Sequence, residues 1–304
     1  FGPQAVEEVS RTSSVFTGKP YGVAQVCRVW EVARSTVYWR RKPQTSTPRR
    51  RGPQGFFPDA AVAEQIRVVI AESPFTGEGY RKVWAMLRDK GVRTSKERTL
   101  RLMRENGLLA VRNPGRPHGP KAHNGTIRTG RVDEMWGTDM TTSLTILEGN
   151  ASIFFAIDHC SLELVGIHAA RRGTRFEALE PIRQGVRHSF GAFGKGVASG
   201  LTLRHDHGSQ FISEDFQREI AFLGIKDSPS YVREPQGNGI AERFVRILKE
   251  NLLWVRRFQT VEDLRQGLLT FKEIYNRQWR IGRHGYRSPQ QVRERQKGTA
   301  CKAA

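Results

Sequence analysis

Three acidic residues that lie on separate predicted elements constrain the fold of this chain more than any other feature. Asp139 lies in an alternating polar and apolar run, and Asp206 ends the short apolar run 201–206, so both occupy predicted strands. Glu242 lies near the start of a predicted helix over residues 239–255. The three carboxylates would converge if the two strands were neighbours and the helix packed across them.

The segment around these acids switches between the strand period and the helix period. Its predicted strands cover residues 135–143, 151–158, 164–170 and 201–206, and its predicted helices cover residues 174–188, 213–223 and 239–255. Thr174 with Glu177 forms a capping-box pattern, and Thr260 with Asp263 begins a further helix. Strands that come first, followed by helices between later strands, predict an α/β fold with a mixed sheet flanked by helices.

Carboxylates in this arrangement indicate metal-dependent phosphoryl transfer. Hard ions such as Mg²⁺ prefer oxygen ligands, and two of them about 3.5–4 Å apart can activate an attacking oxygen and stabilise a leaving one. Like-charge repulsion would oppose the convergence of three carboxylates without a cation. We therefore expect Asp139, Asp206 and Glu242 to be the catalytic residues and the ligands of two Mg²⁺ or Mn²⁺ ions.

Two other interpretations of the acidic segment stay open. Asp158 closes a predicted strand and is the fallback active-site acid, although capping of the following turn is its simpler role. The run His205, Asp206 and His207 suggests a histidine metal site. Alternation along a strand points the side chains of residues 205 and 207 away from the face that carries residue 206, which disfavours that site.

The charge of the chain predicts a polyanionic partner. Its 304 residues include 50 Lys and Arg against 30 Asp and Glu, which gives a net charge of +20 and a pI near 10.6. Charge alone does not distinguish DNA from RNA.

Composition divides the chain into helical units, basic connecting segments and the acid-bearing core. Residues 1–42 predict a helix-turn-helix-like segment with Ser35 as the cap of a second helix. Its apolar positions near helical spacing are Val23, Val26, Val29, Val32 and Val37. Residues 59–110 predict a second helix-turn-helix-like DNA-binding domain, in which Gly91 separates two helices and Ser95 begins the later one. The remaining segments are a basic linker at 43–58, a basic connector at 111–131, the core with its C-terminal helix at 132–295 and a tail at 296–304.

Basic side chains on the helical units and on the predicted Glu242 helix are the expected DNA contacts. They are Arg34, Arg40, Arg41 and Lys42 in the first unit, Arg81, Lys96, Arg98 and Arg101 in the second unit, and Arg243, Arg246 and Lys249 in the core. The alternative for each helical unit is an ordinary solvated basic face. For Glu242 and Arg246 the alternative is a helix pair worth only about 0.2–0.5 kcal/mol, but such a pair explains neither Asp139 nor Asp206.

Several classes of protein are disfavoured. Cys27, Cys160 and Cys301 lie far apart, so neither a structural zinc site nor a disulfide framework is expected. No apolar run approaches the roughly 18 residues that a membrane span requires. The first residues lack the architecture of a signal peptide, so we expect an intracellular protein. The missing initiator Met suggests a segment of a longer fused product.

Ordered motifs along nearly the whole chain resemble one known family. They are the segments 21–42, 79–109 and 275–292, together with the acid-bearing core. These segments are similar to insertion-sequence transposases of the retroviral-integrase-like DDE superfamily, most closely to the second-frame product of the insertion-sequence three family. The C-terminal motif departs from the usual Tyr-Asn-x-x-Arg-Pro-His pattern, because residues 275–280 read YNRQWR.

The resemblance also assigns roles to individual residues. The family places its first catalytic Asp in a W-x-x-D segment, which Trp136 to Asp139 matches. It implies a DNA contact for the basic residue seven positions after the Glu, which is Lys249.

For the protein as a whole, the resemblance implies a ribonuclease-H-like core and a DNA transposase that cleaves the ends of its element and joins the freed 3′-hydroxyl to another phosphodiester. It further implies double-stranded DNA as partner, a homo-oligomer that pairs two element ends, an upstream-frame product or fusion, and a bacterial cytoplasmic, nucleoid-associated location. Two alternatives stay open: a catalytically silent DNA-binding regulator, and a ribonuclease-H-like nuclease that cuts without joining.

Overall fold

The computed structural model describes residues 2–41, 57–111, 127, 129–230 and 239–300. These residues leave out most of the predicted linker 43–58 and most of the predicted connector 111–131. They also leave out Lys42, Cys301 and the side chain of Arg41. The chain divides into two compact units, Phe1–Gln54 and Gly55–Ala304. None of the described helices is long and apolar enough to cross a membrane.

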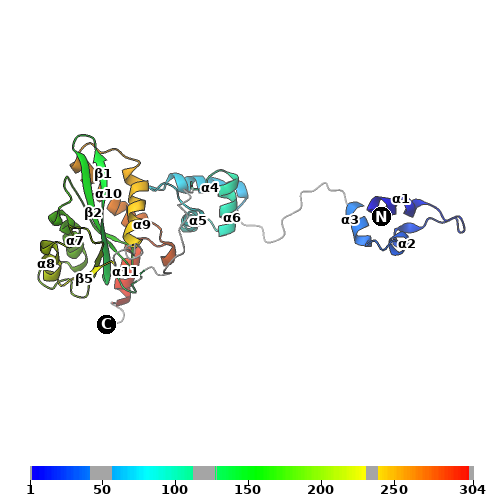
Figure 1. Ribbon diagram of the computed structural model, residues 1–304. Helices are drawn as coiled ribbons and strands as arrows, with labels where there is room; N and C mark the ends of the chain where they lie inside the picture. Colours follow the sequence, from blue (N-terminus) through cyan, green and yellow to red (C-terminus); the bar gives the residue numbers. More distant parts are fainter. Residues whose placement is uncertain (1, 42–56, 112–126, 128, 231–238, 301–304) are drawn as a thin grey trace. The chain divides into compact units, whose positions relative to one another are not determined.

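The first unit is helical in its described part. Its elements are α1 Pro3–Arg11, α2 Gly22–Val29 and α3 Arg34–Arg41 (Figure 1). They pack around a buried cluster formed by Val6, Val26, Cys27 and Val37.

Three details of the first unit differ from the sequence prediction. Helix α1 has no counterpart in the predicted pattern. Val29 is 71% exposed, because it is the last residue of α2 and lies beyond the buried turn. Ser35 lies inside the first turn of α3, which already begins at Arg34, so Ser35 is not the cap.

The unit Gly55–Ala304 begins with another helical bundle. Helices α4 Asp59–Ala71, α5 Tyr80–Asp89 and α6 Lys96–Glu105 bury a cluster that includes Val62, Ile66, Val83, Leu87, Leu102 and Met103. Ser95 caps α6 as predicted, because its Oγ accepts a hydrogen bond from the Arg98 backbone N–H at 3.0 Å. Gly91 separates α5 from α6 with φ +79°, a conformation that glycine adopts without a steric penalty.

The described strands of the core form one sheet in the order β3-β2-β1-β4-β5. β1 Met135–Thr145, β2 Gly149–Asp158 and β3 Leu164–Ala170 pair antiparallel, whereas β4 Thr202–His205 and β5 Lys226–Pro229 extend the sheet beyond β1 in parallel. This confirms the predicted mixed sheet. β5 was not predicted, because its short run KDSP is mostly exposed and lacks apolar alternation.

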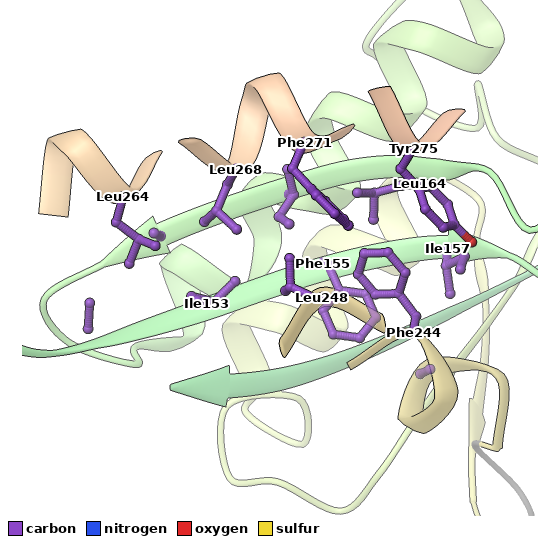
Figure 2. Close-up of a cluster of buried hydrophobic side chains, with 14 of the residues drawn as sticks. Ile153, Phe155, Ile157, Leu164, Phe244, Leu248, Leu264, Leu268, Phe271 and Tyr275 are labelled. Atoms are coloured by element: carbon purple, nitrogen blue, oxygen red, sulfur yellow. The ribbon is translucent and has the colours of Figure 1, made fainter. Parts of the chain in front are cut away.

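Helices cover both faces of this sheet. α7 Arg175–Phe190 and α8 Glu214–Phe222 pack on the face that presents Trp136 and Phe154. α9 Gly239–Leu248 and α10 Val261–Gln278 pack on the opposite face, where Ile153, Phe155 and Ile157 lie among their apolar side chains (Figure 2).

Hydroxyl caps define where α7 and α10 begin. The Thr174 hydroxyl accepts from the Glu177 N–H at 3.4 Å, and the Thr260 hydroxyl accepts from the Asp263 N–H at 3.1 Å, so both predicted helix starts are confirmed. The predicted helix 239–255 is instead α9 followed by a π-helical turn over Lys249–Leu253.

A buried ion cluster anchors the C-terminal helix α11 Pro289–Ala300, which follows the short 3-10 helix Gly282–His284. Arg293 is 4% exposed, and its Nη2 donates to Asp133 Oδ1 at 2.9 Å while its Nε donates to the buried Glu163. Helix α11 is thereby tied to residues at the ends of the sheet.

Candidate active site

Asp139 and Asp206 lie on neighbouring segments of the sheet. β1 and β4 pair in parallel, with Gly137 opposite Arg204. The same register continued by two residues sets Asp139 beside Asp206, and side chains at matched positions of parallel strands point to the same face. β4 ends at His205, so Asp206 is the first residue after the strand. The register therefore brings the first two predicted acids together.

Local backbone bonds orient both of these carboxylates. Asp139 Oδ1 accepts from the Met140 N–H at 2.7 Å, and Asp206 Oδ1 accepts from the Gly208 N–H at 3.0 Å. Asp139 is half-buried, whereas Asp206 is exposed.

Helix α9 brings Glu242 to the same face of the sheet. Asp139 pairs with Phe155 of β2 and shares its face, because directly opposed residues of antiparallel strands point the same way. The Phe155 ring lies 4.7 Å from the ring of Phe244, centroid to centroid. Glu242 lies two residues before Phe244 in the first turn of α9 and is exposed.

The charges of Asp206 and Glu242 affect the pKa of Asp139. Burial, the largest cause, and the charges of Asp206 and Glu242 together raise the pKa of Asp139 from 3.8 to about 6, against the opposing effects of the Met140 N–H and the Lys249 charge. Burial also raises the pKa of Glu242. Asp206, Glu242 and Lys249 therefore lie within electrostatic reach of Asp139.

The arrangement does not amount to a ready-made coordination sphere. Across the described ranges, no group of three or more His, Cys, Asp or Glu side chains is placed so that it could hold a metal ion. Helix α9, which carries Glu242, begins directly after residues 231–238, which are not among the described residues. The acids have the oxygen donors that hard divalent ions prefer, and the charges of Asp206 and Glu242 act on Asp139.

The fallback acid Asp158 serves the turn that follows β2. It is fully buried and accepts hydrogen bonds from the Asp133 N–H at 2.8 Å, the Ser161 N–H at 2.6 Å and the Ser161 hydroxyl at 2.7 Å. Burial raises the pKa of Asp158 to about 6, and these hydrogen bonds oppose the rise. The geometry matches the capping role that the sequence offered as the simpler alternative.

The histidine alternative receives no support from the local geometry. His205 is fully buried, and its Nε2 lies 2.7 Å from Asp227 Oδ1 on β5. The imidazole therefore serves the pairing of β4 with β5, away from the carboxylate of Asp206.

Among the predicted DNA contacts of the core, Lys249 is the one whose charge lowers the pKa of Asp139. Arg246 is exposed, and its Nε lies 2.7 Å from Glu250 Oε1. Arg243 is exposed on α9, and its charge lowers the pKa of Lys82, after the larger effect of burial.

Two predicted contacts of the second helical unit are engaged within that unit. Nη2 of Arg98 and of Arg101 lies 2.7 Å and 2.6 Å from the carboxylate of Asp59, which ties α6 to the start of α4. The Lys96 Nζ lies 4.6 Å from the centre of the Trp84 ring.

Other predicted contacts are surface residues. Arg81 is exposed, and its guanidinium carbon lies 5.4 Å from the centre of the Tyr80 ring. Arg34 and Arg40 are exposed on α3 of the first unit.

Comparison with known proteins gives this site its context. A model described as an HTH-like domain matches residues 58–116, and a model described as an integrase core domain matches residues 223–289, which include α9 and α10. The transposase InsD for insertion element IS2A/D/F/H/I/K of Escherichia coli is 28% identical over 279 residues, covering 89% of this chain and 90% of the relative. The InsD transposase for insertion element IS2D of Escherichia coli strain K12 aligns with the same values. Over most of its length the chain is therefore similar to insertion-sequence transposases, and its second half matches an integrase core domain.

Two solved structures align with part of this chain. A simian T-cell lymphotropic virus intasome in complex with PP2A regulatory subunit B56 gamma aligns with a TM-score of 0.46 and 17% identity, over 69% of this chain and 70% of that one. The HTLV-2 integrase catalytic core domain in complex with magnesium aligns with a TM-score of 0.42 and 16% identity, over 55% of this chain and 99% of that one.

The transposase thus combines an HTH-like region with a ribonuclease-H-like integrase core. It is a DDE-type polynucleotidyl transferase that acts on DNA, and neither the silent regulator nor the nuclease that only cuts is favoured.

Proposed function

We propose that Asp139, Asp206 and Glu242 are the catalytic residues of this transposase and that they hold two divalent ions, Mg²⁺ or Mn²⁺. The observation that carries the proposal is the register of β1 and β4, which sets Asp139 beside Asp206. Burial and repulsion by the other two acids together raise the pKa of Asp139 to about 6. Cations bound among these carboxylates would remove that repulsion, and carboxylate oxygens are the donors that such ions prefer. When bound, two ions would activate the attacking oxygen and stabilise the leaving one.

The proposed reaction needs no bond between protein and DNA. In the first step a water oxygen attacks a phosphodiester at the element end, the bond from phosphorus to the 3′-oxygen breaks, and the 3′-oxygen takes a proton. In the second step the freed 3′-hydroxyl loses its proton and its oxygen attacks another phosphodiester, which releases a new 3′-hydroxyl. The role of Lys249 is to hold a DNA phosphate next to Asp139, because its charge already reaches that carboxylate.

The other parts of the chain would deliver the DNA. We infer helix-turn-helix-like units at residues 1–42 and 59–110, the connecting segments 43–58 and 111–131, the catalytic core at 132–295 and a tail at 296–304. The first unit would bind DNA through Arg34, Arg40, Arg41 and Lys42, and the second through Arg81 and Lys96, with Arg243 and Arg246 contributing from the core. Arg98 and Arg101 would contact DNA only after their ion pairs with Asp59 had broken. We further propose that the protein forms a homo-oligomer that pairs two element ends. We also propose that it is fused to an upstream-frame segment and associates with the nucleoid.

A labelled DNA that carries the flanking element end provides the test. With Mg²⁺ or Mn²⁺, the wild type is expected to cut and to join, and Glu242→Gln is expected to lose both reactions while it still binds DNA. Glu250→Gln is the matched control, because it removes a neighbouring carboxylate that pairs only with Arg246 on the surface. Normal joining by Glu242→Gln would refute the assignment, and cutting without joining by the wild type would point to a nuclease.

A further inference from the structure

A loop of the second helical unit enters the hydrophobic core of the catalytic domain. This α4–α5 loop, residues 72–79, carries Phe75, which is 5% exposed and belongs to the same buried cluster as Phe244 and Phe271. The centroid of its ring lies 4.9 Å from that of Trp279, edge to face. The helical unit and the core therefore share one continuous apolar cluster.

Charged side chains reinforce this junction. The Lys82 Nζ lies 3.1 Å from the centre of the Trp279 ring and 3.2 Å from Glu78 Oε2. Burial lowers the pKa of Lys82, which shows that its ammonium group faces protein more than water. Arg280 of the core lies 2.8 Å from Asp89 at the end of α5. Lys82 and Arg280 therefore attach the helical unit to the core.

The residue after Phe75 bonds directly to the π-helical turn. The Thr76 N–H donates to Asn251 Oδ1 at 2.9 Å, and the Thr76 hydroxyl lies 3.1 Å from the Glu250 carbonyl oxygen and 3.2 Å from Asn251 Oδ1. Asn251 Nδ2 in turn donates to the Ile247 carbonyl oxygen at 2.9 Å. A chain of hydrogen bonds therefore runs from the helical unit into the last turn of α9.

Lys249 lies between two segments that are held in place by packing and hydrogen bonds. On its N-terminal side, α9 is fixed to the sheet by the buried Leu248. On its C-terminal side, the wide turn is closed by the Trp254 N–H, which donates to the Lys249 carbonyl oxygen at 2.9 Å, and is held from outside by Thr76 and Asn251. Isolated π-helical turns are rare and are frequently found at functional sites.

We propose that Thr76 and Asn251 are positioning residues that hold Lys249 toward the acids, so that the helical unit sets the activity of the core. The inference rests on the proposed function of Asp139 and its partner acids. Neither residue touches reacting atoms, and both act through Lys249, which lies seven residues after Glu242 and therefore on the same side of the helical segment. Loss of the Thr76 hydroxyl should misplace Lys249 without removing its charge, so the reaction should slow while the overall affinity for DNA changes little.

The test compares variants that differ in one hydroxyl. Thr76→Val keeps the shape of the side chain and removes the donor, and Thr76 is exposed, so the fold should survive. We expect joining at saturating DNA to fall roughly 3- to 10-fold, the loss typical of one hydrogen bond, with half-saturation unchanged within about 2-fold. Thr76→Ser should restore the rate. Thr270→Val is the matched control, because its hydroxyl bonds only within α10, to the Gln266 carbonyl oxygen.

A double-mutant cycle with Lys249→Ala decides whether Thr76 acts through Lys249. In that background Thr76→Val should have no further effect on the rate, whereas additive losses, or no loss in Thr76→Val alone, would overturn the inference. Hydrogen exchange at the Trp254 amide should be faster in Thr76→Val, and this readout does not depend on catalysis. If Glu242→Gln joined DNA normally, the proposed function would fail, and the exchange rate would still show whether Thr76 holds the turn.

Discussion

Removal of the charge of Asp139 should stabilise the metal-free transposase while it abolishes joining. The pKa of Asp139 is about 6 in the folded protein against 3.8 for an ordinary Asp, chiefly because of burial. A folded pKa above the unfolded one gives stability that is fully present below pH 3.8 and is lost as pH rises through about 6. At about 1.4 kcal/mol for each pH unit across that window, the loss at neutral pH is at most about 3 kcal/mol.

Urea denaturation of the wild type and of Asp139→Asn in EDTA measures this loss. Asn keeps an oxygen that can accept from the Met140 N–H, so the hydrogen bond of the carboxylate is preserved. The stability of the variant relative to the wild type should increase between pH 4 and pH 7.5 by up to about 3 kcal/mol. Added Mg²⁺ should then stabilise the wild type more than the variant. A difference in stability that does not change with pH would refute the electrostatic reasoning.

Two further changes test the fold and the DNA contact. Arg293→Met should destabilise the protein by about 3–5 kcal/mol in urea denaturation, because it leaves the buried Glu163 without its cation; an effect below about 1 kcal/mol would contradict the buried cluster. Lys249→Ala should lower the slope of log K against log salt for end DNA by about 1, as expected for the loss of one phosphate contact; an unchanged slope would place Lys249 away from the backbone.

Features that depend on local chemistry could be predicted from the sequence. Thr174 and Thr260 each stand three residues before an acid and ahead of an amphipathic run, and a cap needs only these nearby residues. The alternation around Asp139 likewise predicts a strand without knowledge of its partner. The mixed sheet follows from such local patterns in sequence order.

Features that depend on distant partners could not be predicted. The register that sets Asp139 beside Asp206 is decided by the pairing of β1 with β4, which no short pattern contains. The loop around Phe75 has the composition of an ordinary surface turn, although its phenylalanine is buried in the catalytic domain. Arg101 counts as a basic residue in any pattern of charge, but whether it meets Asp59 or a phosphate is settled by tertiary structure.

The balance of charge at the site explains why a basic protein keeps a negative centre for DNA chemistry. On the proposed assignment, Asp139, Asp206 and Glu242 set three negative charges against Lys249, whose charge reaches Asp139, so the metal-free site repels a DNA phosphate when all three are ionised. Two divalent ions would reverse the sign of that charge. The basic surface can then attract DNA at any time, whereas the reacting phosphodiester is held at the acids only when the ions are bound. Binding and chemistry are thereby controlled by different groups, and the net charge of the chain reports only the first.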